Sequence, residues 1–155
     1  MTTTSVTIGD LPAGSAGELL TLQRAAYVTE AQLHDELWLP ALTQTLDELV
    51  EELSVSRCLG AWVGPRLVGS IRTREDGDVL RVSRLAVAPD LQGRGTGSRL
   101  LAAAEGNSSC RSAALFTGSL SEPNLRLYRR CGYVEQRREE IRPDLEVVHL
   151  AKALR

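Results

Sequence analysis

Apolar residues recur along this 155-residue chain with two spacings, and each spacing predicts one type of secondary structure. Helical spacing predicts helices that begin near Ser15, Thr45, Gly97 and Ser121. Alternation and short apolar runs between turn residues predict strands at about 6–8, 58–63, 66–72, 80–87, 112–117, 133–141 and 145–152. We therefore expect one α/β domain over residues 1–155, with a central mixed twisted sheet of about seven strands flanked by about four helices.

Capping signals mark the starts of these helices. Ser15 with Glu18, and Thr45 with Glu48, have the spacing of a capping box, in which each side chain accepts a hydrogen bond from the other residue's backbone amide. Ser121 has the residue type of an N-cap for the last helix. We expect all three side chains to cap their helices.

The strand at 80–87 changes its apolar parity partway along. Leu80 and Val82 share one parity, whereas Leu85 and Val87 share the other. A bulge between Val82 and Leu85 would cause this shift, and the alternative is a strand buried on both faces. Such a bulge would splay the strand from its neighbour and free backbone groups that an amide-bearing ligand could pair with.

Glycine occupies every second position from Gly93 to Gly97, between a predicted strand and a predicted helix. Glycine permits positive φ and close approach of a ligand, and a helix N-terminus adds unpaired amides and a positive dipole end. The pattern predicts a phosphate or pyrophosphate site, and hence a nucleotide-bearing cofactor. The spacing departs from the dinucleotide fingerprint G-x-G-x-x-G and lacks the lysine of a triphosphate-binding loop. The alternative is a glycine-rich turn that binds nothing.

Charge and composition narrow the function classes. The formal net charge of −2 lacks the excess of positive charge that is typical of proteins that bind nucleic acid or an anionic membrane surface. Cys58, Cys110 and Cys131 are scattered without the spacing of a metal site or a disulfide framework, so we expect reduced thiols and no metal. The first five residues lack the features of a secretory leader and no apolar run is long enough to span a bilayer, so we expect a cytoplasmic protein.

Two segments resemble motifs of the GNAT superfamily of N-acetyltransferases. Gln92–Gly97 is similar to the family's acetyl-CoA signature Q/R-x-x-G-x-G/A. Leu127–Tyr133 is similar to the end of a second family motif, N-x-x-A-x-x-L-Y-x-x-x-G-F. The family tyrosine acts as general acid toward the leaving CoA thiolate, and the resemblance gives this role to Tyr128. The family asparagine falls on Ser121, while Asn124 stands where a small residue is usual, and either side chain is a candidate contact for pantetheine.

The resemblance implies the GNAT fold, in which a splayed strand pair forms the CoA cleft, with acetyl-CoA as co-substrate and no metal. Pantetheine would pair with the backbone of Leu85–Val87. The cofactor-binding residues that it implies are Leu85, Ala86, Val87, Gln92, Gly93, Arg94, Gly95, Thr96, Gly97, Ser98, Ser121, Asn124 and Tyr128. Members of the family often form homodimers, so a homodimer is a further expectation.

The function that the resemblance implies is direct transfer of acetyl from acetyl-CoA to a primary amine of a small molecule. The alternatives are a protein or peptide acetyltransferase and a non-catalytic acyl-CoA sensor. Glu30, His34 and Trp38 are the candidate acceptor-binding residues, in a segment (29–43) without clean periodicity that is either a binding loop or a connection. The general base is not identified, and water relayed from Glu30, His34, Asp35 or Glu75 is one route.

Overall fold

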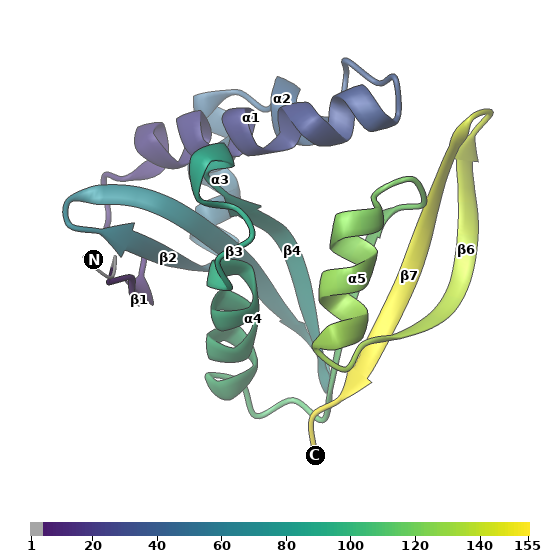
Figure 1. Ribbon diagram of the computed structural model, residues 1–155. Helices are drawn as coiled ribbons and strands as arrows, with labels where there is room; N and C mark the ends of the chain where they lie inside the picture. Colours follow the sequence, from purple (N-terminus) through teal and green to yellow (C-terminus); the bar gives the residue numbers. More distant parts are fainter. Residues whose placement is uncertain (1–4) are drawn as a thin grey trace.

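The computed structural model describes residues 5–155, which form a seven-stranded sheet flanked by helices (Figure 1). The strands are β1 (Thr7–Asp10), β2 (Arg57–Val63), β3 (Arg66–Asp76), β4 (Val79–Val87), β5 (Ser112–Gly118), β6 (Val134–Arg142) and β7 (Leu145–Ala153). The helices are α1 (Ala16–Leu33), α2 (Pro40–Thr43), α3 (Leu46–Val55), α4 (Thr96–Gly106) and α5 (Glu122–Arg130), with a 3₁₀ turn η1 at Pro89–Leu91. The expectation about a leader falls largely on residues 1–4, which lie outside the described residues.

The predicted fold class is confirmed, with one difference in the segment 29–43. Helix α1 continues to Leu33, and α2 adds a short helix at Pro40–Thr43. Glu30 therefore lies on a helix and not in a loop. None of the helices in residues 5–155 is long and apolar enough to cross a membrane.

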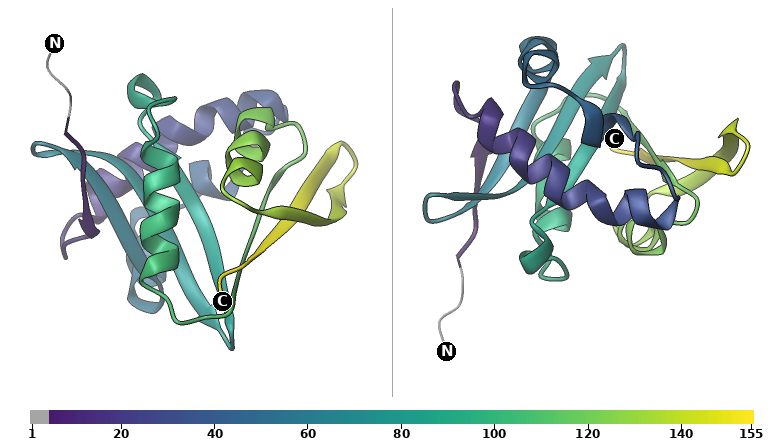
Figure 2. Two further views of the ribbon diagram at one scale, coloured as in Figure 1. Left: turned by 60° about the horizontal axis from the view of Figure 1, so that its bottom comes forward. Right: turned by 90° about the horizontal axis from the view of Figure 1, so that it is seen from above.

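The sheet has the order β1-β2-β3-β4-β5-β7-β6, and only the β4–β5 pair is parallel. Helix α1 packs on β3 and β4, α3 packs on β2, and α4 packs on β2, β3 and β4. The view from above shows α3 and α4 on opposite faces of the sheet (Figure 2). The largest fully buried apolar side chains, which include Leu19, Leu49, Ile71, Leu100 and Leu150, come from these helices, from α5, and from β3 and β7.

The predicted bulge is present in β4. Ser70 of β3 pairs with Ala86 and Arg72 pairs with Ser83, so one residue of β3 faces both Arg84 and Leu85. The parallel pairing of β4 with β5 covers only 79–81 on β4, and beyond it the two strands separate. The parity shift in the sequence therefore marks the place where the sheet opens.

Two of the three predicted caps are wrong. The Ser15 side chain makes no cap hydrogen bond, and its backbone (φ −92°, ψ 7°) is not in the extended region usual at an N-cap. Glu18, its expected partner, instead accepts from the amide of Leu67 at 2.9 Å and ties α1 to the start of β3. Ser121 precedes α5 but does not cap it either, and its hydroxyl donates to Glu30. Only the capping box of Thr45 forms as predicted.

Because Thr45 caps its helix and Ser15 does not, we expect replacement of the two residues by alanine to change the free energy of unfolding by different amounts. Thr45→Ala is expected to lower the free energy of unfolding by about 1 kcal/mol, because it removes the side-chain acceptor for the amide of Glu48. Ser15→Ala, the matched control, is expected to change it by less than about 0.5 kcal/mol, because its hydroxyl caps nothing. Urea unfolding of both variants measures the difference, and equal losses would contradict it.

Candidate functional site

A cleft of about 500 Å³ opens where β4 and β5 separate. Its walls come from α1, the end of β4, the glycine loop, the start of α4 and the helix α5. The lining residues are Ala26, Tyr27, Thr29, Glu30, Leu33, Leu85, Ala86, Val87, Leu91, Gln92, Gly93, Gly95, Thr96, Gly97, Ser98, Pro123, Asn124, Arg126, Leu127 and Arg130. Segments that lie far apart in the sequence therefore meet at the splayed strand.

The glycine loop presents a helix N-terminus to this cleft. Gly93 and Gly95 have φ values of 77° and 83°, which other residues rarely adopt. Gly95 is the N-cap of α4, and the first backbone hydrogen bond from the helix runs from the Arg99 amide to the Gly95 carbonyl at 3.1 Å. The amides of 96–98 precede that bond, so they are available to an anion.

Close packing fixes the loop in this shape. A Cβ at Gly97 would lie 3.3 Å from the Leu127 side chain of α5, so that side chain would have to shift by a few tenths of an ångström to admit it. The Gln92 side chain donates to the carbonyl of Val87 at 3.1 Å, and η1 is held by a two-bond pair between Arg66 and Asp90. The loop is therefore built before any ligand binds.

Two cations add to the positive end of α4. Arg126 and Arg130, on α5, line the cleft, whereas Arg94 of the glycine loop is exposed and does not line it. Guanidinium groups and helix amides together suit a phosphate or pyrophosphate group. This end of the cleft has the chemistry of an anion site.

The bulged segment of β4 forms the other end of the cleft. Leu85, Ala86 and Val87 line it, and no residue of β4 beyond Arg81 pairs with β5. The hydroxyl of Tyr27, on α1, lies 3.4 Å from the carbonyl oxygen of Leu85. Tyr27 was not among the predicted site residues, although it lies one turn before Glu30 on the same helix.

Glu30 joins α1 to α5 at the floor of the cleft. Its Oε1 accepts hydrogen bonds from Ser121 Oγ at 2.6 Å and from Asn124 Nδ2 at 3.2 Å. Asn124 also donates to the hydroxyl of Thr117 on β5, at 3.3 Å. Ser121 is fully buried and does not line the cleft, whereas Asn124 does. The other carboxylate oxygen of Glu30 accepts none of the side-chain hydrogen bonds found in residues 5–155.

Tyr128 lies on the same helix as Asn124, one turn further on, and is 6% exposed. Its ring packs edge-on against Tyr133, with centroids 6.1 Å apart. Burial raises the pKa of Tyr128 above its ordinary value, and Tyr27 and Glu30 raise it further. Its hydroxyl makes none of the side-chain hydrogen bonds found in residues 5–155, and Tyr128 is not among the residues that line the cleft, whereas its neighbours Asn124 and Leu127 on α5 are. Tyr128 is therefore a protonated phenol at neutral pH that is free to donate a hydrogen bond.

The structure does not bring His34 or Trp38 to the cleft. The His34 ring is buried, with Nδ1 3.0 Å from the Glu30 carbonyl oxygen, and Nε2 accepts from the amide of Leu120 at 3.3 Å. This ring clamps the end of α1 to the loop between β5 and α5. Trp38 is 78% exposed beyond the end of α1. Of the three residues, only Glu30 lines the cleft.

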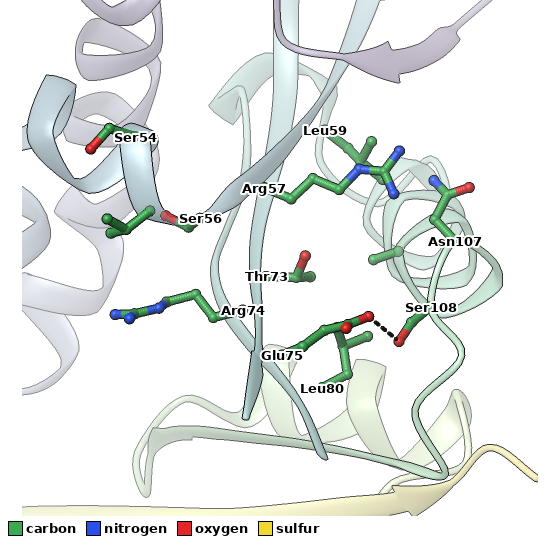
Figure 3. Close-up of a pocket in the computed structure, with 12 residues that line it drawn as sticks. Ser54, Ser56, Arg57, Leu59, Thr73, Arg74, Glu75, Leu80, Asn107 and Ser108 are labelled. Carbon is green, nitrogen blue, oxygen red and sulfur yellow. Dashed lines mark hydrogen bonds between the residues drawn. The ribbon is translucent and has the colours of Figure 1, made fainter. Parts of the chain in front are cut away.

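A second cavity, of about 450 Å³, lies at the C-terminal end of α4 (Figure 3). Glu75 is in this cavity and accepts a hydrogen bond from Ser108 at 3.2 Å, so it is separated from the cleft by the length of α4. Arg57 also lines it and pairs with Asp10 on β1. No part of the glycine loop lines this cavity.

Cysteines and metal-ligating side chains do not gather at the cleft. Cys58 is buried, and burial raises the pKa of its thiol to about 11, while Cys131 touches Ser98 but does not line the cleft. Within residues 5–155, no group of three or more His, Cys, Asp or Glu side chains is arranged to hold a metal ion.

The family model of the acetyltransferase (GNAT) domain matches residues 25–154 of this chain. A search of curated protein sequences finds no significant match to it.

Solved structures with a similar fold include the PaiA N-acetyltransferase of Thermoplasma acidophilum in complex with coenzyme A, with 17% identity, a TM-score of 0.74, and 96% of this chain and 99% of that chain covered. The ribosomal-protein-S18-alanine N-acetyltransferase of Escherichia coli has 15% identity and a TM-score of 0.78, and the match covers 97% of this chain and 94% of that chain. An acetyltransferase of Bacillus subtilis in complex with CoA has 20% identity and a TM-score of 0.73, and the match covers 96% of this chain and 99% of that chain. These similarities show that the fold is shared.

The clamp by His34 leads to a prediction for Gly118, at the end of β5. A Cβ at Gly118 would collide with the His34 ring, which hydrogen bonds hold at both nitrogens, so Gly118→Ala is expected to lower the free energy of unfolding by about 1–3 kcal/mol. Gly106→Ala is the control, because the added methyl group meets nothing within 4 Å, and it is expected to be neutral or stabilising. Equal stability of the two variants in urea unfolding would contradict the clamp.

Proposed function

The chain belongs to the acetyltransferase family defined by the GNAT domain, and from this we propose that it transfers acetyl directly from acetyl-CoA to the primary amine of a small molecule. The observation that carries the proposal is the cleft itself. It combines a preformed anion site at the start of α4 with an unpaired, bulged strand at the end of β4. That pairing of features fits a long ligand that has phosphates at one end and amides at the other.

Each part of acetyl-CoA has matching groups in the cleft. The amides of 96–98, with Arg126 and Arg130, would hold the pyrophosphate. The free backbone of Leu85–Val87 would pair with the pantetheine amides, as in the addition of a strand. Asn124, which lines the cleft, is a better pantetheine contact than the buried Ser121. Two of the structurally similar acetyltransferases were solved with coenzyme A bound, which supports this reading.

Transfer requires stabilisation of negative charge on the thioester oxygen and on the leaving sulfur. Backbone amides of the bulged segment would donate to the thioester oxygen as the amine attacks. The Tyr128 phenol would then donate its proton to the CoA thiolate as the carbon–sulfur bond breaks. The raised pKa of Tyr128 keeps this proton available across the neutral range.

The attacking amine must lose a proton, since a protonated amine has no free electron pair. Glu30 is the carboxylate that lines the cleft, and the hydrogen bonds from Ser121 and Asn124 hold one of its oxygens. The second oxygen would accept the amine proton, directly or through one water. Glu30 is therefore assigned the role of general base.

Direct transfer is favoured over a covalent acyl-enzyme. No cysteine lines the cleft, and the buried Cys58 thiol has a pKa of about 11, so it is a poor nucleophile at neutral pH. A small acceptor is favoured over a peptide because Glu36, after α1, forms an ion pair with Arg142 at the end of β6. This contact ties the segment after α1 to the β6–β7 hairpin, so an extended peptide could not pass between these two elements without breaking it.

Removal of the Tyr128 hydroxyl tests the enzyme proposal. Tyr128→Phe is expected to bind acetyl-CoA within a few-fold of the wild-type Kd but to lower kcat by about 100-fold or more, because the leaving thiolate loses its proton donor. Calorimetry and a thiol-release assay over a panel of amines, including peptides with N-terminal alanine, measure both quantities. Tyr133→Phe is the matched control, since its hydroxyl bonds to Glu105 at 2.8 Å and not in the cleft.

Three outcomes of these assays carry different conclusions. Retained kcat in Tyr128→Phe would contradict its role as the acid. Binding of acetyl-CoA without turnover of any amine would favour the sensor, and turnover of peptides alone would favour the peptide acetyltransferase.

Replacement of the Glu30 carboxylate by an amide tests the base. Glu30→Gln is expected to lower kcat by about 100-fold at neutral pH, and the rate is expected to recover as pH rises and the amine deprotonates in solution. Glu122→Gln, which changes an exposed carboxylate on α5, is the control and is expected to follow the wild-type profile. A Glu30→Gln profile that parallels the wild type at every pH would exclude Glu30 as the base.

A further inference from the structure

We propose that Arg84, backed by Arg72, binds an anionic group on the acceptor, so that the acceptor is an amine that also carries a carboxylate, such as an amino acid. This inference rests on the proposed function, because it concerns the acceptor of the same site. It is based on the backbone conformation of Arg84, on the burial of both arginines, and on their nitrogen atoms that lack a hydrogen-bond partner within residues 5–155.

The backbone places Arg84 in an unusual position. Arg84 lies in the bulge of β4 with φ of 52°, a left-handed conformation that side-chain-bearing residues adopt at a cost. Asp35 and Asp144 are the other non-glycine residues with positive φ in residues 5–155, and aspartate tolerates this region better than arginine does. A long cationic side chain is therefore held at the point where the sheet opens.

Arg84 lacks the partner that most arginines of this protein have. Its Nε is buried without a hydrogen-bond partner, and Arg84 takes part in no ion pair within residues 5–155. Eight exposed arginines are paired with carboxylates: Arg57, Arg66, Arg81, Arg111, Arg129, Arg137, Arg138 and Arg142. The arginines without an ion pair within residues 5–155 are otherwise exposed to solvent, whereas Arg84 is partly buried. A buried unpaired donor is costly, which favours a ligand that supplies the acceptor.

Arg72 adds a second, more deeply buried cation to this region. It is 2% exposed, and its Cα pairs with that of Ser83, the residue before Arg84. Its Nη2 donates to Gln23 at 2.6 Å and its Nε forms an ion pair with Glu52 at 3.4 Å, while Nη1 has no hydrogen-bond partner within residues 5–155. Burial lowers the pKa of Arg72, Glu52 raises it, and the charge of Arg84 lowers it further. Glu52 pairs with Arg72 and not with Arg84, so the charge of Arg84 has no carboxylate partner within residues 5–155.

Arg84 lies next to the cleft along the chain, although neither Arg84 nor Arg72 is among the residues that line it. Arg84 precedes Leu85, which does line the cleft and whose carbonyl oxygen accepts a hydrogen bond from the Tyr27 hydroxyl at 3.4 Å. Burial raises the pKa of Tyr27. The charges of Arg84 and Arg72 lower this pKa and the charge of Glu30 raises it, so charges of both signs act on the Tyr27 side chain. An acceptor with its amine at Glu30 and its carboxylate at Arg84 would be complementary to the negative charge of the one and the positive charge of the other.

The acidic residues after α1 do not offset this charge. Glu36 is buried and pairs with Arg142, and one oxygen of Glu30 is engaged by α5. The acidic stretch in the sequence therefore does not by itself create a site for a basic acceptor.

Matched acceptors and variants test the proposal. Initial rates are measured with each common amino acid and with its amide, for the wild type, Arg84→Gln and Arg84→Lys. The wild type is expected to prefer acids over amides by about 10- to 100-fold in kcat/KM. Arg84→Gln is expected to lose that preference through a higher KM, with kcat within a few-fold, and Arg84→Lys to keep part of it. Arg81→Gln, on the same strand and paired with Asp76, is the control and is expected to keep the preference.

A binding measurement gives a result that does not depend on turnover. N-acetylated amino acids and their amides are titrated by calorimetry into the wild type and Arg84→Gln, each saturated with CoA, after thermal unfolding shows that the variant is folded. Binding of acids that is lost in Arg84→Gln supports the proposal, even if no amine is turned over and the proposed function fails. Equal use or binding of acids and amides by the wild type, or a preference that survives in Arg84→Gln, overturns it.

Discussion

Strand β4 pairs with β5 only over 79–81, and the separation of the two strands beyond that point positions every part of the site. The bulge at Arg84 and Leu85 puts two residues of β4 against one of β3, which increases twist and turns the strand away from β5. Backbone groups that a continuous sheet would pair therefore have no β5 partner beyond Arg81, and Leu85, Ala86 and Val87 line the cleft there. In the proposed function the amides of pantetheine pair with these groups, so the opening of the sheet would also be the binding site.

The helices around the opening divide the chemistry between them. The start of α4 and the arginines of α5 supply positive charge at one end, while Glu30 of α1 is bonded to α5 at the other. Glu30 thus ties α1 to α5 through one carboxylate oxygen, while its other oxygen lies 3.9 Å from Nδ1 of His34. Tyr128, buried on α5, keeps its proton because burial disfavours the phenolate. The proposed proton acceptor and proton donor thus lie on two helices that Glu30 joins.

Local patterns in the sequence predicted the fold and the outline of the cleft. The parity shift between Val82 and Leu85 located the bulge, and the alternate glycines located the start of α4, because both are properties of neighbouring residues. Contacts between distant residues could not be predicted in this way. Glu18 bonds to Leu67 and Ser121 bonds to Glu30, so two side chains with capping signals serve tertiary contacts. Tyr27 was missed for the same reason, since the packing of α1 on β4 brings it to Leu85. Arg72 and Arg84 were also missed, since the register of β3 and β4 places them near each other.

Binding of acetyl-CoA between the glycine loop and the splayed strand is tested most directly by an NMR titration of backbone amides in isotope-labelled protein. The amides of 85–87 and 96–98 are expected to shift together and to saturate with one Kd, while those of 73–75, in the second cavity, stay in place. Shifts confined to 73–75, or shifts at 96–98 without any at 85–87, would contradict binding along the opened strand.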